Sequence, residues 1–535
     1  MTAKAATPDT PIPEARLQTP APEVDWGKLM LGFGAMVIGQ FMAILDIQIV
    51  ASSLPQIQAG ISASADEISW IQTAYLIPEV VMIPLSGYLS RLWGTQKVFM
   101  ASCLGFTLMS VLTGMSTSID MMIITRALQG FVGGAMIPSV FAIAFTAFPP
   151  EKRVTTSVIM GLIVTLAPTI GPTLGGHLTE MFGWRSLFFI NAPIGLVVLF
   201  GVWRWGDFDK GDPSLAKGFD WFGLAVMAAF LMSMQYVIEE GAKAEWFADP
   251  EILLLTIVAA ICGVTFVWRS LSYRQPIVEL RAFANRNFMI GVTMTFVSGA
   301  ALFGGTFLMP LFLGRVRNYS SSEIGTTMVI SGISMFLTGP IAGRLVRRLD
   351  ARICMFVGFA MVAWGMWLGH AVTAEWGFWE FAAVQAFRGV GVMIAMIASQ
   401  TVTMSTLPPQ MVKNASGLVN LSRNVGGAVG MAVLSTTLTQ QSARHLADIA
   451  NRVTAASQGS QDMMAGLLAR MEELGVADPD GAARKAFFGL MQQQATVLAY
   501  GDGFTLLAIA GAAAAIAALF AKPAKAHPGL LSDAH

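Results

Sequence analysis

The chain has 535 residues, of which 54% are hydrophobic and 12% are charged, and its formal net charge is zero. Soluble proteins of this length usually carry about twice that charged share, and a balanced charge does not suit nucleic-acid binding. The three cysteines have no C-x-x-C spacing, which predicts packing residues and excludes a disulfide framework or a metal site.

Apolar segments of about 20 residues recur along the chain, and a helix of that length crosses a hydrocarbon core of about 30 Å. These segments predict transmembrane helices at 29–51, 69–89, 97–116, 120–145, 154–178, 186–205, 219–239, 250–269, 288–311, 322–343, 351–371, 377–404, 412–437 and 502–521. The sequence therefore predicts an all-α integral membrane protein with about 14 transmembrane helices. Residues 1–28 predict a disordered tail and no signal peptide.

Two features of the connecting segments predict how the chain is oriented. Lys and Arg number 21 on the side that carries both termini, whereas the short connections on the other side carry four, namely Arg185, Lys243, Arg315 and Arg317. The positive-inside rule then places both termini, including the 522–535 tail, in the cytoplasm. The polar segment 438–501 has helix-period stretches, which predicts a helical hairpin on the opposite, periplasmic side.

A weak internal repeat indicates two related halves. The stretch from Gly87 to Leu92 resembles the stretch from Gly343 to Arg348, each directly after a predicted helix. A parallel duplication of six-helix units is typical of secondary transporters. The predicted domains are an N-terminal bundle at 29–205, an inserted helix pair at 206–287 and a C-terminal bundle at 288–521.

Five ionisable residues lie well inside predicted spans, away from the span ends: Asp46, Glu79, Arg126, Arg388 and Arg423. Such groups cost several kcal/mol in a bilayer and are candidates for function. A carboxyl group that is shielded from water holds a proton more readily, which is the property that a proton-coupled carrier needs. The alternative interpretation is that each acid is a structural partner of a buried arginine.

Other residues are candidates for the lining and the hinges of such a carrier. Gln48, Gln129 and Asn420, with Arg388 and Arg423, are candidates for the substrate cavity. A second group of small residues and a proline predicts close helix packing and a bend in the 154–178 helix; its members are Gly171, Pro172, Gly175 and Gly176. No GxxxxGK[ST] sequence occurs, which argues against an ATP-driven pump and leaves the proton gradient as the energy source, without a cofactor.

Several motifs in their chain order resemble one family. They are Leu45-Asp46 with Leu54-Pro55, the Gly87 to Lys97 loop, Arg126-x-x-Gln129-Gly130, Gly171-Pro172-x-x-Gly175-Gly176, and Trp184-Arg185 followed by Phe188 to Gly195. Together they resemble the fourteen-helix drug:proton antiporter group of the major facilitator superfamily, the EmrB/QacA type. The resemblance covers residues 30–521.

The resemblance implies a fold of two six-helix bundles with two inserted helices. It also implies a gating role for Gly87 and Arg91 in the cytoplasmic loop, although this chain has Ser90 where the family usually has Asp. The hairpin is similar to that of members which bind a periplasmic membrane-fusion adaptor and an outer-membrane channel in a tripartite pump of the bacterial inner membrane.

These observations predict proton-coupled efflux of hydrophobic or amphipathic small molecules, and no enzymatic activity. One alternative is a dedicated exporter of a single metabolite, such as a siderophore, a fatty-acid-like compound or a phenolic compound. An alternative of another class is a sensor or scaffold that transports nothing. The buried Asp46, Glu79 and Arg126 argue against a scaffold, because a scaffold has no need of groups that are costly to bury.

Overall fold

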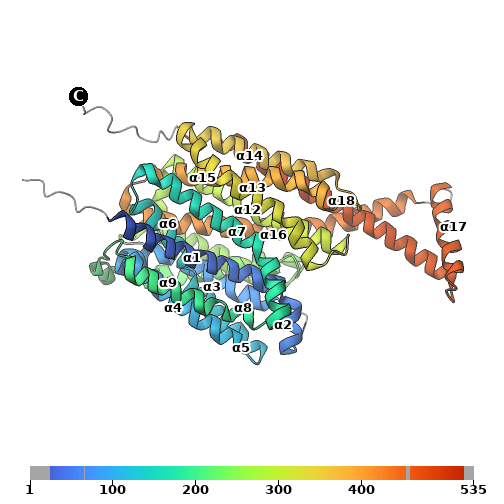
Figure 1. The fold of residues 1–535 in the computed structure, drawn as a ribbon, viewed down its shortest axis with the longest axis horizontal. Coiled ribbons are helices and arrows are strands. Elements are labelled where there is room, and N and C mark those ends of the chain that lie inside the picture. The colour runs from blue at the N-terminus through green and yellow to red at the C-terminus, as the bar shows by residue number, and fades with distance from the viewer. Residues whose placement is uncertain (1–24, 65–66, 406, 454–457, 523–535) are drawn as a thin grey trace, which may run out of the picture.

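The computed structural model describes residues 25–522 apart from 65–66, 406 and 454–457, and the regular elements of these residues are all helices (Figure 1). The α-helices are Trp26–Ser52 (α1), Leu54–Ile61 (α2), Trp70–Trp93 (α3), Thr95–Gly114 (α4), Ile119–Gly133 (α5), Met136–Thr146 (α6), Pro150–Phe182 (α7), Ser186–Phe189 (α8), Asn191–Trp205 (α9), Trp221–Glu240 (α10), Pro250–Ser272 (α11), Arg286–Arg315 (α12), Ser321–Arg348 (α13), Ala351–Leu368 (α14), Phe378–Ser405 (α15), Pro409–Arg452 (α16), Gln458–Glu473 (α17) and Pro479–Ala518 (α18). Short 3₁₀ helices lie at Pro213–Gly218, Trp246–Ala248, Leu280–Ala284 and Gly369–Ala371.

The predicted membrane helices all coincide with helical segments of the structure. Eleven of the described segments are long and apolar enough to span a bilayer alone, and the two parts of α7, which meet at a bend of 46°, make a twelfth. The bend lies between Pro168 and Ile170, one turn before the Pro172 at which the sequence predicted it. Helices α3 and α16 fall below that apolar threshold, since both carry polar side chains into the interior of the bundle.

The two halves repeat the same packing. Helix α1 packs on α7 as α12 packs on α16, α3 packs on α5 as α13 packs on α15, and α4 packs on α9 as α14 packs on α18. The halves meet along α3–α16 and α7–α13. The inserted helices α10 and α11 pack on each other, and α10 also contacts α3 and α16, so it touches both halves.

Glycines allow the closest of these helix contacts. A methyl group at Gly130 would overlap the carbonyl oxygen of Tyr75, and one at Gly134 would lie 2.9 Å from the carbonyl oxygen of Glu79. Helix α5 therefore lies directly on the backbone of α3. Between the halves, a methyl group at Gly87 would lie 2.8 Å from the carbonyl oxygen of Lys413. Helices α3 and α16 are therefore as close there as α3 and α5 are, at the end of the bundle where the described chain begins and ends.

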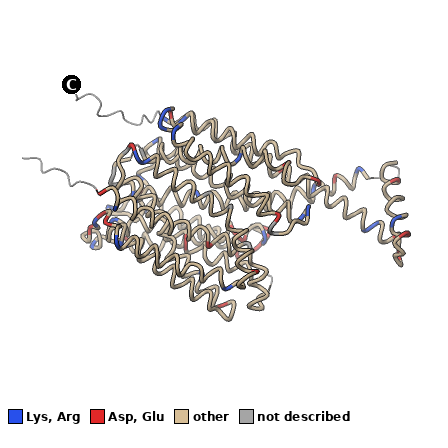
Figure 2. Tube along the Cα trace, viewed as in Figure 1, with Lys and Arg blue, Asp and Glu red and all other residues tan. Residues whose placement is uncertain are grey.

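The segment 438–501 contains helices, as its periodicity predicted, and two of them are continuous with the neighbouring membrane helices. Helix α16 continues past residue 437 to Arg452, and α18 begins at Pro479, well before residue 502. The end of α16, all of α17 and the start of α18 project from the bundle, opposite the described ends of the chain (Figure 1). We call residues 438–453 and 458–501, most of which project from the bundle, the extension. Charged residues concentrate at the two ends of the bundle and on the extension (Figure 2).

Substitution of Gly130 by alanine tests the α3–α5 contact. We expect Gly130→Ala to lower the free energy of unfolding by about 1–3 kcal/mol, because the added methyl group forces two backbones apart. Thermal unfolding of the purified protein in detergent measures the change. Gly34→Ala on α1 is the matched control, since a methyl group there meets nothing within 4 Å. Equal stability of the two variants would contradict the close contact.

Candidate functional site

A buried ion pair joins α1 and α5 at the centre of the N-terminal half. The Nη1 of Arg126 lies 2.6 Å from the Oδ2 of Asp46, and both side chains are 0% exposed. Gln129, one turn after Arg126 on α5, donates from Nε2 to Asp46 Oδ1 at 3.3 Å and accepts from Arg126 Nη1 at 3.0 Å. The Arg126-x-x-Gln129 spacing thus places both side chains on the face of α5 that meets α1.

Asn191 completes the environment of the Asp46 carboxylate. It is the first residue of α9, and its Nδ2 donates to Asp46 Oδ1 at 2.7 Å and to Ser110 Oγ at 2.9 Å. Asn191 was not among the predicted site residues, although it lies within the Phe188 to Gly195 motif and is a lone amide at the start of an apolar helix. Arg126, Gln129 and Asn191 together hold the side chain of Asp46 in place.

The guanidinium of Arg126 has further contacts on α3. Its Nε donates to the carbonyl oxygen of Ile71 at 3.3 Å, and its Cζ lies 4.4 Å from the ring centre of Tyr75. An arginine over an aromatic ring gains a cation–π attraction that grows when water is excluded. Arg126 therefore ties α1, α3 and α5 together through one side chain.

Glu79 lies on α3 near this network but is not part of it. Its side chain is 2% exposed, and within the described part of the chain no hydrogen bond to its carboxyl group is found. Arg126 and Arg423 attract its negative charge and Asp46 repels it. A buried acid that shares its surroundings with two arginines is a candidate for binding and releasing a proton.

The C-terminal half contributes Arg423 and Asn420 from α16. Arg423 Nη2 donates to Asn420 Oδ1 at 2.5 Å, and its Cζ lies 5.4 Å from the ring centre of Phe141 on α6. A small cavity opens beside this arginine, lined by Thr295, Ser298, Met396, Ser399, Gln400 and Arg423. Ser399 Oγ and Gln400 Oε1 have no hydrogen-bond partner among the described residues, so the cavity offers free polar atoms.

Arg388 is buried on α15 without such a cavity. Its guanidinium donates to Ser331 Oγ at 2.8 Å and to the carbonyl oxygen of Leu302 at 3.2 Å. In the described ranges no carboxylate pairs with it. Gly305 on α12 lies directly against the guanidinium, where a side chain would not fit.

The predicted hinge glycines lie on α7, and the predicted gate residues lie at the end of α3, where α3 meets α16. Gly171 on α7 lies against Gln48 on α1, and Gly176 faces open space, while Gly175 is buried. At the chain-end side, Lys413 of α16 pairs with Asp209 and donates to the carbonyl oxygen of Ser90 at 3.3 Å.

Arg91 is not part of that ion pair. Its Nε has no partner among the described residues, and its Cζ lies 5.3 Å from the ring centre of Tyr88. The described residues also contain no cluster of three or more His, Cys, Asp or Glu that could hold a metal ion.

The sequence pattern of the Major Facilitator Superfamily matches residues 36–431, which include α1, α3, α5 and most of the C-terminal half. The chain belongs to the major facilitator superfamily. Its predicted family and fold are thereby confirmed, and it is a membrane transporter and not an enzyme.

Relatives in this superfamily are EmrB-type export proteins. The colistin resistance protein EmrB of Acinetobacter baumannii is 37% identical over 481 residues, which cover 89% of this chain and 93% of that protein. The multidrug export protein EmrB of Escherichia coli (strain K12) is 30% identical, with 80% and 84% covered. The fatty acid resistance protein FarB of Neisseria gonorrhoeae is 28% identical, with 80% and 83% covered.

Solved structures of this superfamily show the same fold at low identity. The proton:xylose symporter XylE matches with a TM-score of 0.57 at 12% identity, covering 94% of this chain and 97% of that one. The human organic anion transporter MFSD10 matches with a TM-score of 0.55 at 13% identity, covering 90% and 99%.

Removal of the charge on Asp46 tests the buried ion pair. We expect Asp46→Asn to lower the free energy of unfolding by about 3–5 kcal/mol, because Arg126 is left as an uncompensated buried charge. Asp480→Asn removes the acid of an exposed pair with Arg484, at 2.7 Å, and should change stability by less than about 1 kcal/mol. Chemical unfolding in detergent compares the two variants. Similar small losses in both would contradict an energetically important pair at Asp46.

Proposed function

We propose that this transporter exports hydrophobic or amphipathic small molecules in exchange for protons. The observation that carries the proposal is the position of Glu79. It is a buried acid without a hydrogen-bond partner in the described chain, and the charges that act on it come from both halves, from Asp46 and Arg126 in one and Arg423 in the other. An acid in that place responds to both halves, which is what coupling of a proton to their movement requires.

The two acids have different roles in this proposal. Asp46 receives donors from Arg126, Gln129 and Asn191 and is the fixed charge that orients Arg126. Glu79 is the proton carrier. When Glu79 takes a proton from the outside, its attraction to Arg423 is lost and the contact between the halves weakens; release of the proton to the cytoplasm restores it.

The energy of one proton is sufficient for export. At a membrane potential of about 150 mV one inward charge supplies about 3.5 kcal/mol. At about 1.4 kcal/mol per tenfold, this supports a substrate gradient of a few hundredfold. A stoichiometry of one proton per substrate is therefore adequate for efflux of toxic compounds.

In this proposal the substrate site forms around Arg423 when the two halves separate, since the cavity beside this arginine has a volume of only about 10 Å³ in the present conformation. Ser399 and Gln400 provide free hydrogen-bonding atoms, and Met396 provides an adaptable apolar wall. Arg388 is a structural residue in this scheme, because Gly305 closes the space beside it.

A dedicated exporter of one metabolite is the second candidate. The positive charge of Arg423 at the cavity favours an anionic metabolite, and one relative carries the name fatty acid resistance protein.

We also propose that both termini are cytoplasmic, in the bacterial inner membrane, and that the extension meets a periplasmic membrane-fusion adaptor and, through it, an outer-membrane channel. The shape of the hairpin supports this part of the proposal, since it projects from the bundle and exposes the large apolar side chains of Met463, Leu474, Phe488 and Leu490.

Replacement of Glu79 by glutamine tests proton coupling. Proteoliposomes with an imposed pH gradient are supplied with ethidium, oleate or Nile red as cationic, anionic and neutral substrates. We expect the transported compound to accumulate about tenfold per unit of imposed pH difference in the unmodified protein, since each unit supplies about 1.4 kcal/mol per proton, and to equilibrate in Glu79→Gln.

The control for this experiment is Glu180→Gln, at an exposed position on α7. It should keep the pH-driven accumulation. Accumulation that persists in Glu79→Gln would show that Glu79 is not the proton carrier, and transport of none of the compounds by the unmodified protein would contradict the export of broad substrate classes.

Substitution of exposed apolar residues of the extension by aspartate tests the proposed adaptor contact. We expect Phe488→Asp with Leu490→Asp to abolish the protection that the protein gives to growing cells, because the apolar contact is lost, while uptake into proteoliposomes stays unchanged. The control is Arg484→Ala on the same helix, which should leave both intact. Full protection in the double variant would contradict an adaptor contact at these residues.

A further inference from the structure

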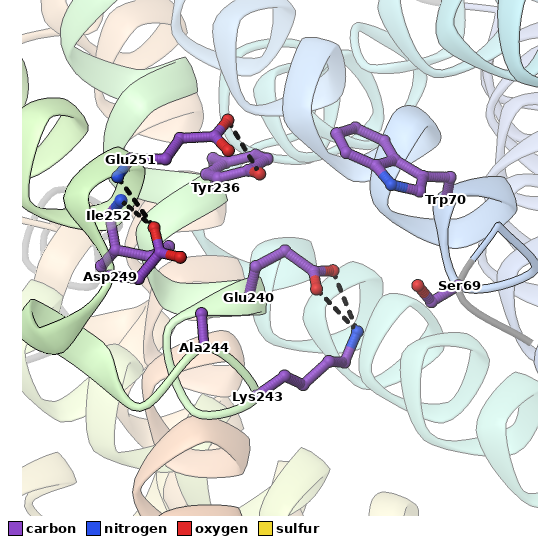
Figure 3. Close-up of a pocket in the computed structure, with 9 residues that line it drawn as sticks. All are labelled: Ser69, Trp70, Tyr236, Glu240, Lys243, Ala244, Asp249, Glu251 and Ile252. Atoms are coloured by element: carbon purple, nitrogen blue, oxygen red, sulfur yellow. Dashed lines mark hydrogen bonds and ion pairs between the residues drawn. The ribbon is translucent and has the colours of Figure 1, made fainter.

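A larger cavity lies away from the central site, at the end of the bundle that carries the extension. Its volume is about 370 Å³, and its walls are the start of α3, the end of α10 and the start of α11 (Figure 3). Small-molecule sites in proteins have volumes from about 300 Å³ upwards. The inserted helix pair thus forms a cavity of ligand size that the proposed transport cycle does not use.

One wall of this cavity is aromatic. Trp70 of α3 and Tyr236 of α10 have ring centres 5.8 Å apart, and Trp70 is 36% exposed. The Trp70 side chain extends into the space from the side opposite α11 (Figure 3). Aromatic faces attract organic cations, tryptophan most strongly.

The opposite wall is acidic. Three carboxylates line the cavity, those of Glu240, Asp249 and Glu251, against one ammonium group, that of Lys243. Lys243 Nζ lies 2.9 Å from both oxygens of Glu240, and Tyr236 donates to Glu251 Oε1 at 3.1 Å. The lining therefore keeps negative charge that its own lysine does not balance.

The walls are fixed before any ligand arrives. Asp249 Oδ1 accepts from the backbone nitrogens of Glu251 and Ile252 and so caps α11. In the loop before α11, Glu245 and Trp246 lie in the left-handed region, with φ of 55° and 57°. This backbone conformation costs residues other than glycine about 1–2 kcal/mol. Trp246 Nε1 donates to Thr436 Oγ1 on α16 at 3.1 Å and anchors the loop.

We propose that this cavity binds an organic ammonium ion, with the charged group between Glu240 and Glu251 and the apolar part against Trp70. The proposal combines the aromatic wall, the unbalanced carboxylates and a fixed cavity of suitable volume. The ammonium group belongs either to a free amine or to a phosphatidylethanolamine headgroup, which carries the same chemistry. The site is separate from Glu79 and does not depend on the proposed transport cycle.

Binding of benzyltrimethylammonium to the purified full-length protein in detergent tests the proposal, with calorimetry as the measurement. We expect Glu240→Gln, Glu251→Gln and Trp70→Leu each to weaken binding roughly three- to tenfold. Lys243→Gln should strengthen it several-fold, because Glu240 loses its competing ammonium group. A gain in affinity cannot arise from misfolding, so the Lys243→Gln variant tests the site even if the other variants lose binding because they fold poorly.

Control variants and competitors complete the experiment. Trp379→Leu, at an exposed tryptophan of α15, and Glu79→Gln should bind the probe as the unmodified protein does. Displacement of the probe by dihexanoyl-phosphatidylethanolamine, and not by dihexanoyl-phosphatidylglycerol, assigns a lipid headgroup; displacement by putrescine alone assigns a free amine. Binding that is unaffected by changes at Trp70, Glu240 and Lys243, or abolished by Glu79→Gln, would place the probe in the central cavity and overturn the proposal.

Discussion

The buried pair of Asp46 and Arg126 is the constraint on which the rest of the N-terminal half depends. An unpaired charge in a bilayer interior is costly, so α1 and α5 must meet where these residues meet. Gly130 lets α5 lie on the backbone of α3, which brings Arg126 to the carbonyl oxygen of Ile71. Asn191 satisfies the remaining oxygen of Asp46 and thereby fixes the start of α9. A single carboxylate therefore determines how several helices are placed.

The C-terminal half repeats this packing with a different distribution of charge. Arg388 on α15 lies against α12 and α13 as Arg126 on α5 lies against α1 and α3. Where α1 offers the Asp46 carboxylate, α12 offers the carbonyl oxygen of Leu302 and the small Gly305. One half thus pairs its arginine with a carboxylate, whereas the other surrounds its arginine with uncharged hydrogen-bond acceptors. This asymmetry leaves the C-terminal half more positive at its centre, which supports assignment of proton binding to the N-terminal half and of polar substrate groups to Arg423.

Most of the fold could be predicted from the sequence, because membrane helices are defined by length and apolar content. The positions of Asp46 and Arg126 inside apolar segments also indicated that both are buried. That they pair with each other could not be predicted, since the pairing depends on the rotation of α1 and α5 about their axes. The role of Asn191 depends on the same geometry. The helical periodicity of residues 438–501 was visible in the sequence. That α16 and α18 run into this segment without a break was not, because the segment lacks the apolar content that marks a membrane helix.

The inserted helices affect how the two halves can move relative to each other, because α10 contacts both halves. At the extension end, Thr73 of α3 donates to Glu240 at 3.2 Å, and Trp246 donates to Thr436 of α16. In the proposed cycle the contact between the halves weakens, so α3 moves relative to α16 and these two bonds cannot both persist. Each contributes only about 1 kcal/mol, which is small beside the energy of one translocated proton. The inserted pair can therefore favour the present arrangement of the two halves without preventing their movement, and a ligand beside Glu240 would change that balance from outside the central site.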